Sequence, residues 1–281
     1  MLRMAKEQFL EWLKNHKQCI WLVFVVFMYQ YISAPLIENA ELMGSPLGVL
    51  EPYIGLSNNL LLQTVIPVFF LILLSGFPEK YGTSYFSAVR IGRERWLSVQ
   101  IVFLIFCCLA FSAMAFLISV LTAAGHISVQ WEWSSVLTEF GEKFPELSSN
   151  YGNSILDERT YFQGQPPETA AWSFFLMNLH LFVLGMLQLT AYCTGIGRAG
   201  YVSSILTEAM GLLLCAAESP AKWIFPLSHG IFSTHFTKYY ADEIVPVSYS
   251  ILYFGGFLLI FYIACSLGIK KVSMTGGEGK V

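Results

Sequence analysis

The sequence predicts an all-α integral membrane protein with six transmembrane helices, and composition, apolar runs and charge placement each favour that class. Of its 281 residues, 55% are hydrophobic and only 12% are charged, about half the charged share of soluble domains. The apolar runs are continuous and do not alternate, which favours helices over a β-barrel. A helix also satisfies its own backbone hydrogen bonds in lipid.

Lys and Arg gather on one side of the predicted spans. Twelve of the sixteen fall in the N-terminal tail, two tight loops and the C-terminal tail, and only Lys143, Arg159, Lys222 and Lys238 fall on the other side. Positive charge near span ends stays cytoplasmic, so we expect both termini inside and an even number of spans. Twelve basic against five acidic residues give +7 inside, and four against thirteen give −9 outside.

Six apolar segments reach or approach the roughly 20 residues needed to cross the hydrocarbon core. The predicted spans are 19–36, 60–77, 96–124, 172–193, 201–217 and 249–269. The first span follows Lys14 and Lys17 and lacks a small-residue cleavage site, so we expect a retained helix. The six cysteines lie in or beside spans, and the outer segments lack Asn-X-Ser/Thr acceptors, which favours a bacterial plasma membrane.

Residues 1–281 are predicted to form a single transmembrane domain with two segments of note on the cytoplasmic side. In residues 1–17, apolar residues recur at helical spacing, which predicts an amphipathic helix lying along the inner leaflet; an ordinary cytoplasmic helix or a frayed tail is the alternative. That apolar face consists of Leu2, Ala5, Phe9, Trp12 and Leu13. Residues 78–95 predict a second, short amphipathic helix, which either contacts a cytoplasmic partner or serves as a positively charged anchor.

Two further segments are predicted outside the membrane. Residues 125–171 are too long for a loop without structure of its own, so we expect a small external subdomain of short helices. In residues 218–246, Pro220, Pro226 and Pro246 interrupt apolar pieces that are too short to span. This pattern predicts re-entrant or interfacial helices and an outer gate.

The sequence carries no signature of enzymatic or metal chemistry. The loop Gly-x-x-x-x-Gly-Lys-Ser/Thr is absent, so this chain is not expected to bind ATP or Mg itself. His229 and His235 are six residues apart and match no metal-ligand spacing, so no metal site is expected. The only Asp residues, Asp157 and Asp242, lie outside the spans, and Gly-x-Ser-x-Gly is missing, so we do not expect a protease or another enzyme.

A few polar residues are predicted within or beside the spans, where burial in lipid requires a partner or a cavity. They either line a polar path or hold helices together; helix packing is favoured for the amides, and both roles stay open for Glu208. His180 and Glu208 lie at similar depths, although the sequence does not show whether their faces meet. The candidates are Asn59, Gln63, Asn178, His180 and Glu208.

The layout resembles the permease subunits of ABC-2-type transporters. The resemblance covers the whole chain as architecture: an N-terminal interfacial helix, six spans and broken outer helices before the last span. The stretch Phe86-Ser-Ala-Val-Arg90-Ile-Gly-Arg93-Glu-Arg95-Trp96 looks like the coupling segment of that family. The external segment 125–171 is longer than in the simplest members.

The resemblance implies an exporter of an amphipathic peptide, a lipid-like molecule or an antibiotic, energised by two copies of a separate cytoplasmic ATPase that bind the ATP and Mg. It also implies a second permease chain, identical or similar, and contact with membrane lipid; no nucleic acid is expected. The residues expected to contact the ATPase are Tyr85, Phe86, Arg90, Arg93 and Glu94.

Two other classes share the topology. A stand-alone binding or regulatory protein, such as an immunity or sensor component, would capture a peptide outside and need no ATPase. An ion-coupled carrier is disfavoured because only Glu208 and His180 are ionisable within the spans, and no inverted repeat is evident.

Overall fold

The computed structural model describes residues 1–78, 92–156, 158–237 and 242–270, and the predicted all-α membrane class is confirmed. Within these ranges, five helices are long and apolar enough to cross a membrane, and six if one bent pair counts as a single span. The strands among the described residues are a parallel two-residue pair, β1 (Leu47–Gly48) and β2 (Ile127–Ser128).

The first pass is one long helical unit that follows α1 (Leu2–Leu13). It runs through η1 (His16–Cys19), α2 (Ile20–Met28), the π-helical turn η2 (Tyr29–Ser33) and α3 (Ala34–Met43). The predicted span 19–36 was therefore too short. Its apolar run ends near Leu36, but the helix continues, and Gly44, in the left-handed conformation at φ 63°, stops it.

The second pass is broken between α4 (Glu51–Asn58) and α5 (Leu60–Leu73), whose axes differ by 86°. All eight residues of α4 are buried. The predicted span 60–77 missed α4, whose Glu51, Ser57 and Asn58 make it too polar to be recognised as membrane-embedded. The pair nevertheless returns the chain across the bundle, because β1 lies beside β2 at one end whereas the Leu73 carbonyl contacts α1 at the other.

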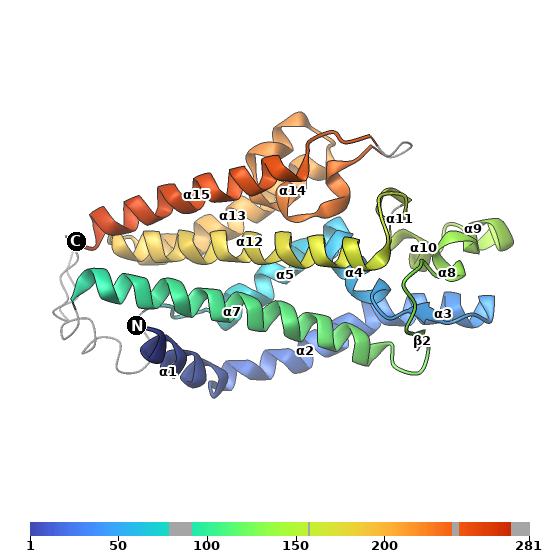
Figure 1. Ribbon diagram of the computed structural model, residues 1–281, viewed down its shortest axis with the longest axis horizontal. Coiled ribbons are helices and arrows are strands. Elements are labelled where there is room, and N and C mark those ends of the chain that lie inside the picture. Colours follow the sequence, from blue (N-terminus) through green and yellow to red (C-terminus); the bar gives the residue numbers. More distant parts are fainter. Residues whose placement is uncertain (79–91, 157, 238–241, 271–281) are drawn as a thin grey trace.

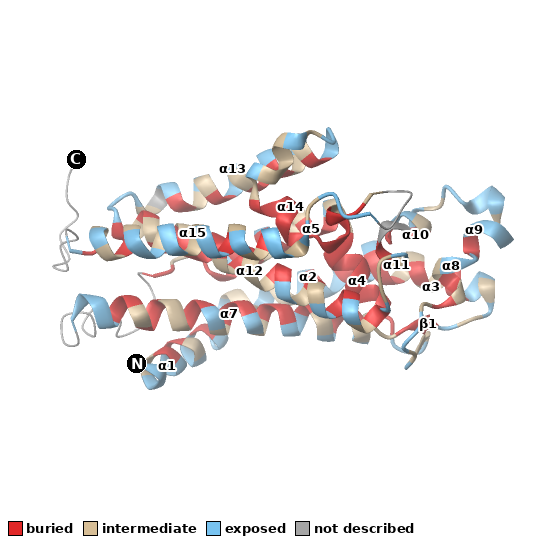
Figure 2. Cartoon of the chain, turned by 45° about the horizontal axis from the view of Figure 1, so that its top comes forward, coloured by how far each residue is buried: buried red, intermediate tan, exposed pale blue. Residues whose placement is uncertain are grey.

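Four long helices complete the bundle: α7 (Arg93–Thr122), α12 (Pro166–Cys193), α13 (Gly197–Ala216) and α15 (Val247–Gly268). The central helix α12 packs against α4, α7, α13 and α15. α13 and α15 carry many exposed residues (Figure 2), and several of them are large and apolar, as lipid or a second chain requires. Examples are Val202, Ile205, Leu206, Leu213, Leu252, Leu259, Ile260 and Leu267.

Close backbone contact holds α12 and α15 together at one end. A Cβ atom at Gly268 would lie only 2.6 Å from the carbonyl oxygen of Cys193. The two backbones therefore meet at a point where no larger side chain fits.

The ends of the bundle differ in character. α1, the start of α7 and the end of α15 lie together at one end, and the short helices that precede α12 lie at the other (Figure 1). We call these the inner end and the outer end. The shared end of α1 and α15 agrees with an even number of passes.

At the inner end, α1 packs on α7 through Ala5, Gln8 and Trp12, which are buried. Leu2 and Leu13 from the predicted apolar face are exposed. Ala5 and Trp12 of the predicted apolar face are therefore buried against the bundle, and Gln8 lies on the same side, 3.4 Å from Gln100.

The last carbonyls of α5 accept hydrogen bonds from side chains of other elements. Trp12 Nε1 donates to Leu73 O at 2.9 Å, Tyr201 Oη donates to Leu74 O at 2.8 Å, and Lys17 Nζ donates to Ser75 O. Carbonyls at a helix end lack partners within the helix, so such contacts stabilise them. The end of α5 is therefore tied to α1, η1 and α13.

Between β2 and α12 at the outer end lie α8 (Ser135–Thr138), α9 (Phe140–Lys143), η3 (Pro145–Leu147), α10 (Tyr151–Ser154) and α11 (Glu158–Tyr161). Glu51, fully buried in α4, anchors this region. Its carboxylate accepts hydrogen bonds from Ser134 N at 2.7 Å, Ser134 Oγ at 2.8 Å and Gly48 N at 2.8 Å.

Among the described residues between α13 and α15 lie three short helices, η4 (Pro220–Ile224), α14 (Pro226–Gly230) and η5 (Phe232–His235). We call residues 220–235 the outer cap. All five residues of α14 are buried, and the proline at the start of η4 and of α14 suits the first turn of a helix. The cap does not span the bundle.

We predict that Glu51→Ala will loosen the outer region. The change leaves two buried N–H groups, on Gly48 and Ser134, without acceptors, at a cost of about 1–3 kcal/mol each. Limited proteolysis of the protein in detergent should cut residues 129–165 faster than in the wild type. Glu132→Ala, at an exposed residue of the same region, is the matched control, and equal cleavage of all three proteins would contradict the anchoring role.

Candidate functional site

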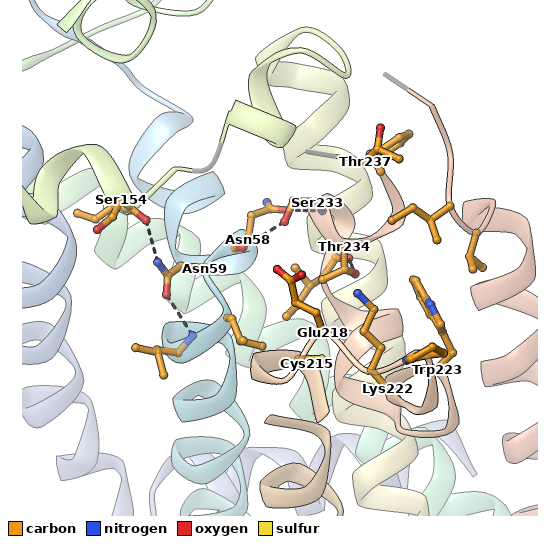
Figure 3. A pocket seen from close by; sticks show the side chains of 18 of the residues that line it. Asn58, Asn59, Ser154, Cys215, Glu218, Lys222, Trp223, Ser233, Thr234 and Thr237 are labelled. Atoms are coloured by element: carbon orange, nitrogen blue, oxygen red, sulfur yellow. Dashed lines mark hydrogen bonds between the residues drawn. The ribbon is translucent and has the colours of Figure 1, made fainter. Parts of the chain in front are cut away.

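A cavity of about 1050 Å³ opens at the outer end between the start of α5, the end of α13, α10 and the outer cap. Figure 3 shows side chains from these elements around one space. The polar lining includes Asn58, Asn59, Glu218, Lys222, Ser233 and Thr234. A concave site with a few placed polar groups is the usual form of a small-molecule site.

Asn58 links three elements at the floor of this cavity. Its Nδ2 donates to Ser173 Oγ of α12 at 2.8 Å, and its Oδ1 accepts from Ser233 N of the cap at 3.0 Å. Its backbone oxygen also accepts from Ser233 Oγ at 3.2 Å. The break in the second pass is therefore held to α12 and to the outer cap by one side chain.

Asn59 occupies the break itself and caps α5. Its Oδ1 accepts from Leu61 N at 3.1 Å and Leu62 N at 3.3 Å, while its Nδ2 donates to Ser154 O at 3.2 Å. An Asn at this position satisfies the free N–H groups at the start of a helix. The residue thus joins α5 to α10, in keeping with a packing role.

Two charges of opposite sign face the cavity. Figure 3 shows Glu218 and Lys222 pointing into the same space, near Trp223. Lys222 Nζ lies 5.6 Å from the Trp223 ring centroid, within the range of a cation–π contact. Neither charge forms an ion pair with another described residue, and Glu218 has a left-handed backbone at φ 51°. Such a site suits a ligand that is both charged and apolar.

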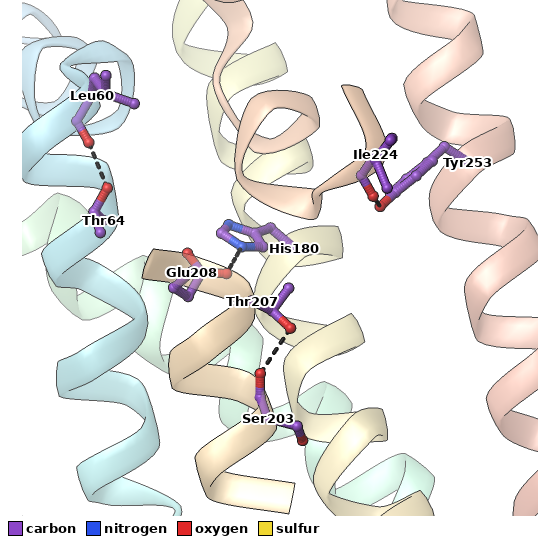
Figure 4. A network of polar contacts seen from close by, with 8 residues as sticks. All are labelled: Leu60, Thr64, His180, Ser203, Thr207, Glu208, Ile224 and Tyr253. Carbon is purple, nitrogen blue, oxygen red and sulfur yellow. Dashed lines mark hydrogen bonds and ion pairs between the residues drawn. The ribbon is translucent and has the colours of Figure 1, made fainter. Parts of the chain in front are cut away.

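The structure brings His180 and Glu208 together beneath the cap (Figure 4). His180 Nε2 lies 2.8 Å from Glu208 Oε1, and both side chains are buried. His180 Nδ1 and Glu208 Oε2 have no hydrogen-bond partner among the described residues. A Cβ at Gly230 would lie 2.9 Å from His180 Nδ1, so the backbone of α14 rests directly on this pair.

The other two candidate amides lie apart from this pair. Asn178 Nδ2 donates to Phe174 O of its own helix at 2.8 Å. Gln63 is fully buried, and in the described part of the chain its amide has no hydrogen-bond partner. Neither residue lines the outer cavity.

Of the residues expected to contact an ATPase, Tyr85, Phe86 and Arg90 lie outside the described residues. Arg93 and Glu94 are exposed at the start of α7. Arg93 Nη1 donates to the carbonyl oxygen of Lys270, which joins the inner ends of α7 and α15.

Several residues of the site were not among the sequence candidates, notably Asn58, Glu218, Lys222 and Trp223. The sequence signal for them was weak. Residues 218–223 combine one acidic residue, one basic residue, one tryptophan and a proline, and nothing else in the sequence marks them. His229 and His235 lie in the cap, and no cluster of three potential metal ligands occurs among the described residues.

Comparisons with protein-family models, with curated proteins and with solved structures found no match. The fold and hydropathy define the class as a multi-pass helical membrane protein.

We predict that Glu208→Ala will destabilise the bundle, because it leaves the His180 ring in a buried polar site without its partner. Leaving a buried donor or acceptor without its partner costs about 1–3 kcal/mol. The midpoint of thermal unfolding in detergent should fall clearly, and Glu208→Gln should fall less because its amide can still bond to His180.

Glu168→Ala, at an exposed glutamate on the same helix as His180, controls for loss of a carboxylate in general. Equal unfolding midpoints for Glu208→Ala and the wild type would show that the His180–Glu208 contact does not stabilise the packing of α12 against α13. If Glu208→Gln also left assembly and transport unchanged, the carboxylate would have no part in the mechanism.

Proposed function

We propose that this chain is the permease subunit of an ATP-driven ABC-2-type exporter in a bacterial plasma membrane, with both termini cytoplasmic. The observation that supports it best is the paired break at the outer end: a kinked second pass and a non-spanning cap enclose a cavity of about 1050 Å³. Irregular backbone at such a place is tolerated where it lines a cavity.

The energy comes from a separate ATPase in two copies, which bind ATP and Mg, because this chain has no nucleotide-binding loop. Tyr85, Phe86, Arg90, Arg93 and Glu94 form the contact with it. Closure of the ATPase pair moves this contact, and the bundle passes between two states that open to opposite sides.

A second permease chain, identical or similar, completes the pathway. The outward apolar faces of α13 and α15 provide surface for lipid and for this second chain. The long helices of one chain pack around a buried core, and the cavity of about 1050 Å³ lies at the outer end.

The cargo is an amphipathic peptide, a lipid-like molecule or an antibiotic. Glu218 and Lys222 supply both signs of charge, and Trp223 supplies an apolar face, so the cavity fits a molecule with charged and apolar parts. Release at the outer end then makes the direction outward.

A stand-alone binding or regulatory protein is the second candidate. The observation that favours it is the attachment of the outer region to α4 through three hydrogen bonds to Glu51, which would suit a receptor for a peptide. It would need no ATPase, and the same cavity would hold the captured ligand.

We predict that the tagged chain, purified from its native membrane in mild detergent, will bring down a soluble ATPase. Charge reversal at Arg90 and Arg93 should remove the ATPase and abolish ATP hydrolysis in the eluate, while membrane insertion is unchanged. Reversal of the exposed residues Lys6 and Lys14 is the matched control for cytoplasmic charge and should retain both.

An eluate without any ATPase, from a chain that is folded and monodisperse, would contradict the exporter and favour the binding or regulatory protein. An ATPase that stays bound and coupled after reversal of Arg90 and Arg93 would contradict the assigned contact alone.

A further inference from the structure

Two buried histidines of the outer cap flank one serine of the last pass. His229 Nδ1 lies 2.6 Å from Ser250 Oγ, and His235 Nε2 lies 2.7 Å from the same oxygen. All three side chains are fully buried. The serine hydroxyl on α15 therefore contacts one histidine of α14 and one of η5.

The remaining ring nitrogens both face backbone carbonyls. His229 Nε2 lies 2.9 Å from Trp223 O, and His235 Nδ1 lies 3.0 Å from Ile231 O. A carbonyl oxygen only accepts hydrogen bonds, so each of these two nitrogens must carry a proton.

The two neutral histidines and Ser250 together have one proton too few to make every contact among them a hydrogen bond. A neutral imidazole has a single N–H, and in both rings it is committed to a carbonyl. The two nitrogens that face Ser250 are then bare acceptors, but the hydroxyl has one proton and can donate to only one of them. The other short contact would join two acceptors, whereas one added proton would turn it into a hydrogen bond.

The surroundings include groups that favour and groups that oppose this proton. The Tyr253 ring stacks on His229 at a centroid distance of 3.8 Å, and aromatic faces attract cations. The positive charges of Lys222 and His180 oppose it, acting on His235 and on His229 respectively, and His180 is itself bonded to Glu208. Tyr249 packs beside His229, and Asp242 and Glu243 are exposed on the strand-like segment that bonds to the His235 backbone.

Burial sets the range in which the proton binds. The pKa of His229 falls to about 4 and the pKa of His235 also falls, in both cases mainly because of burial. The carbonyl contacts offset part of this lowering. A charge-assisted contact to Ser250 raises proton affinity further. Uptake therefore falls on the acidic side of the ordinary histidine pKa of about 6.5. Because the unfolded chain binds these protons first, overall stability declines as pH falls through this range.

We propose that His229, Ser250 and His235 together form a binding site for one proton, which links both turns of the outer cap to α15. The site binds one proton and not two, because a second would place two positively charged rings on either side of Ser250 and near Lys222, and the serine hydrogen would then face no acceptor ring nitrogen. Ser233 of η5 bonds to Asn58, and both residues line the cavity. The proton bound by His235 of the same helix therefore places a positive charge next to the cavity wall. This proposal does not depend on the exporter assignment.

The test is nuclear magnetic resonance of the chain in lipid nanodiscs, with ¹⁵N in the histidine rings, from pH 8 to pH 3. His229→Asn and His235→Asn assign the two ring signals. We expect both rings to report a single shared proton with one midpoint below 6.5. In Ser250→Ala the proton affinity should fall about tenfold, in line with loss of one hydrogen bond to a charged group.

Ser250→Thr keeps a hydroxyl and should retain the shared titration. Ser228→Ala is the matched control, because Ser228 is a buried serine of the same cap that bonds to Cys215 and to Lys222 O and to neither histidine. Its titration should equal that of the wild type.

Three results would overturn the proposal: two protons bound with separate midpoints, an unchanged midpoint in Ser250→Ala, or two rings that stay neutral down to pH 3 in a folded chain. If Ser250→Ala fails to fold, the number of protons bound by the wild type decides the question by itself.

Discussion

The amide of Asn58 is the interaction on which the outer half of the molecule depends. Where the second pass breaks, helix N–H and carbonyl groups lose their partners, and inside a membrane protein they must find others. Asn58 bonds to Ile54 O in its own helix, to Ser173 in α12 and to Ser233 in the cap. One residue thus stabilises the kink, fixes the cap and closes the floor of the cavity. Without this amide, the link between α4 and α12 through Ser173 would be lost, and the cap would keep only the hydrogen bond from Ser233 Oγ to the Asn58 backbone oxygen.

The two ends of the bundle are built differently, and this bears on the exporter hypothesis. At the inner end, Trp12, Tyr201 and Lys17 bind the last carbonyls of α5, so three elements hold the start of the segment predicted to contact an ATPase. At the outer end, α4 bends away from α5 by 86° and contacts the cap. The inner end of α5 is bonded to three elements, and its outer end lines the cavity. A movement of α5 along its axis would therefore change the cavity wall.

The long apolar helices and the placement of both termini on one side could be predicted from sequence. Hydropathy is averaged over about 20 residues of each span, and the side is set by the distribution of sixteen Lys and Arg residues. The break at Asn58 and Asn59 could not, since α4 combines Glu51, Ser57 and Asn58 with only eight residues and has no apolar run. Similar depth suggested that His180 and Glu208 could meet, but their contact depends on the packing of α12 against α13, which single-chain periodicity does not specify. The charges of Glu218 and Lys222 became informative only when the fold placed them in one cavity.

The contact between Gly268 and the Cys193 carbonyl makes the inner end of α15 a pivot. At a rise of about 1.5 Å per residue, Ser250 lies roughly 27 Å from that pivot along the helix. A tilt of about 2° then carries the serine through roughly 1 Å, which takes a hydrogen bond of normal length out of range. A small tilt of α15 about its inner end would therefore break the contacts between Ser250 and the two histidines of the cap.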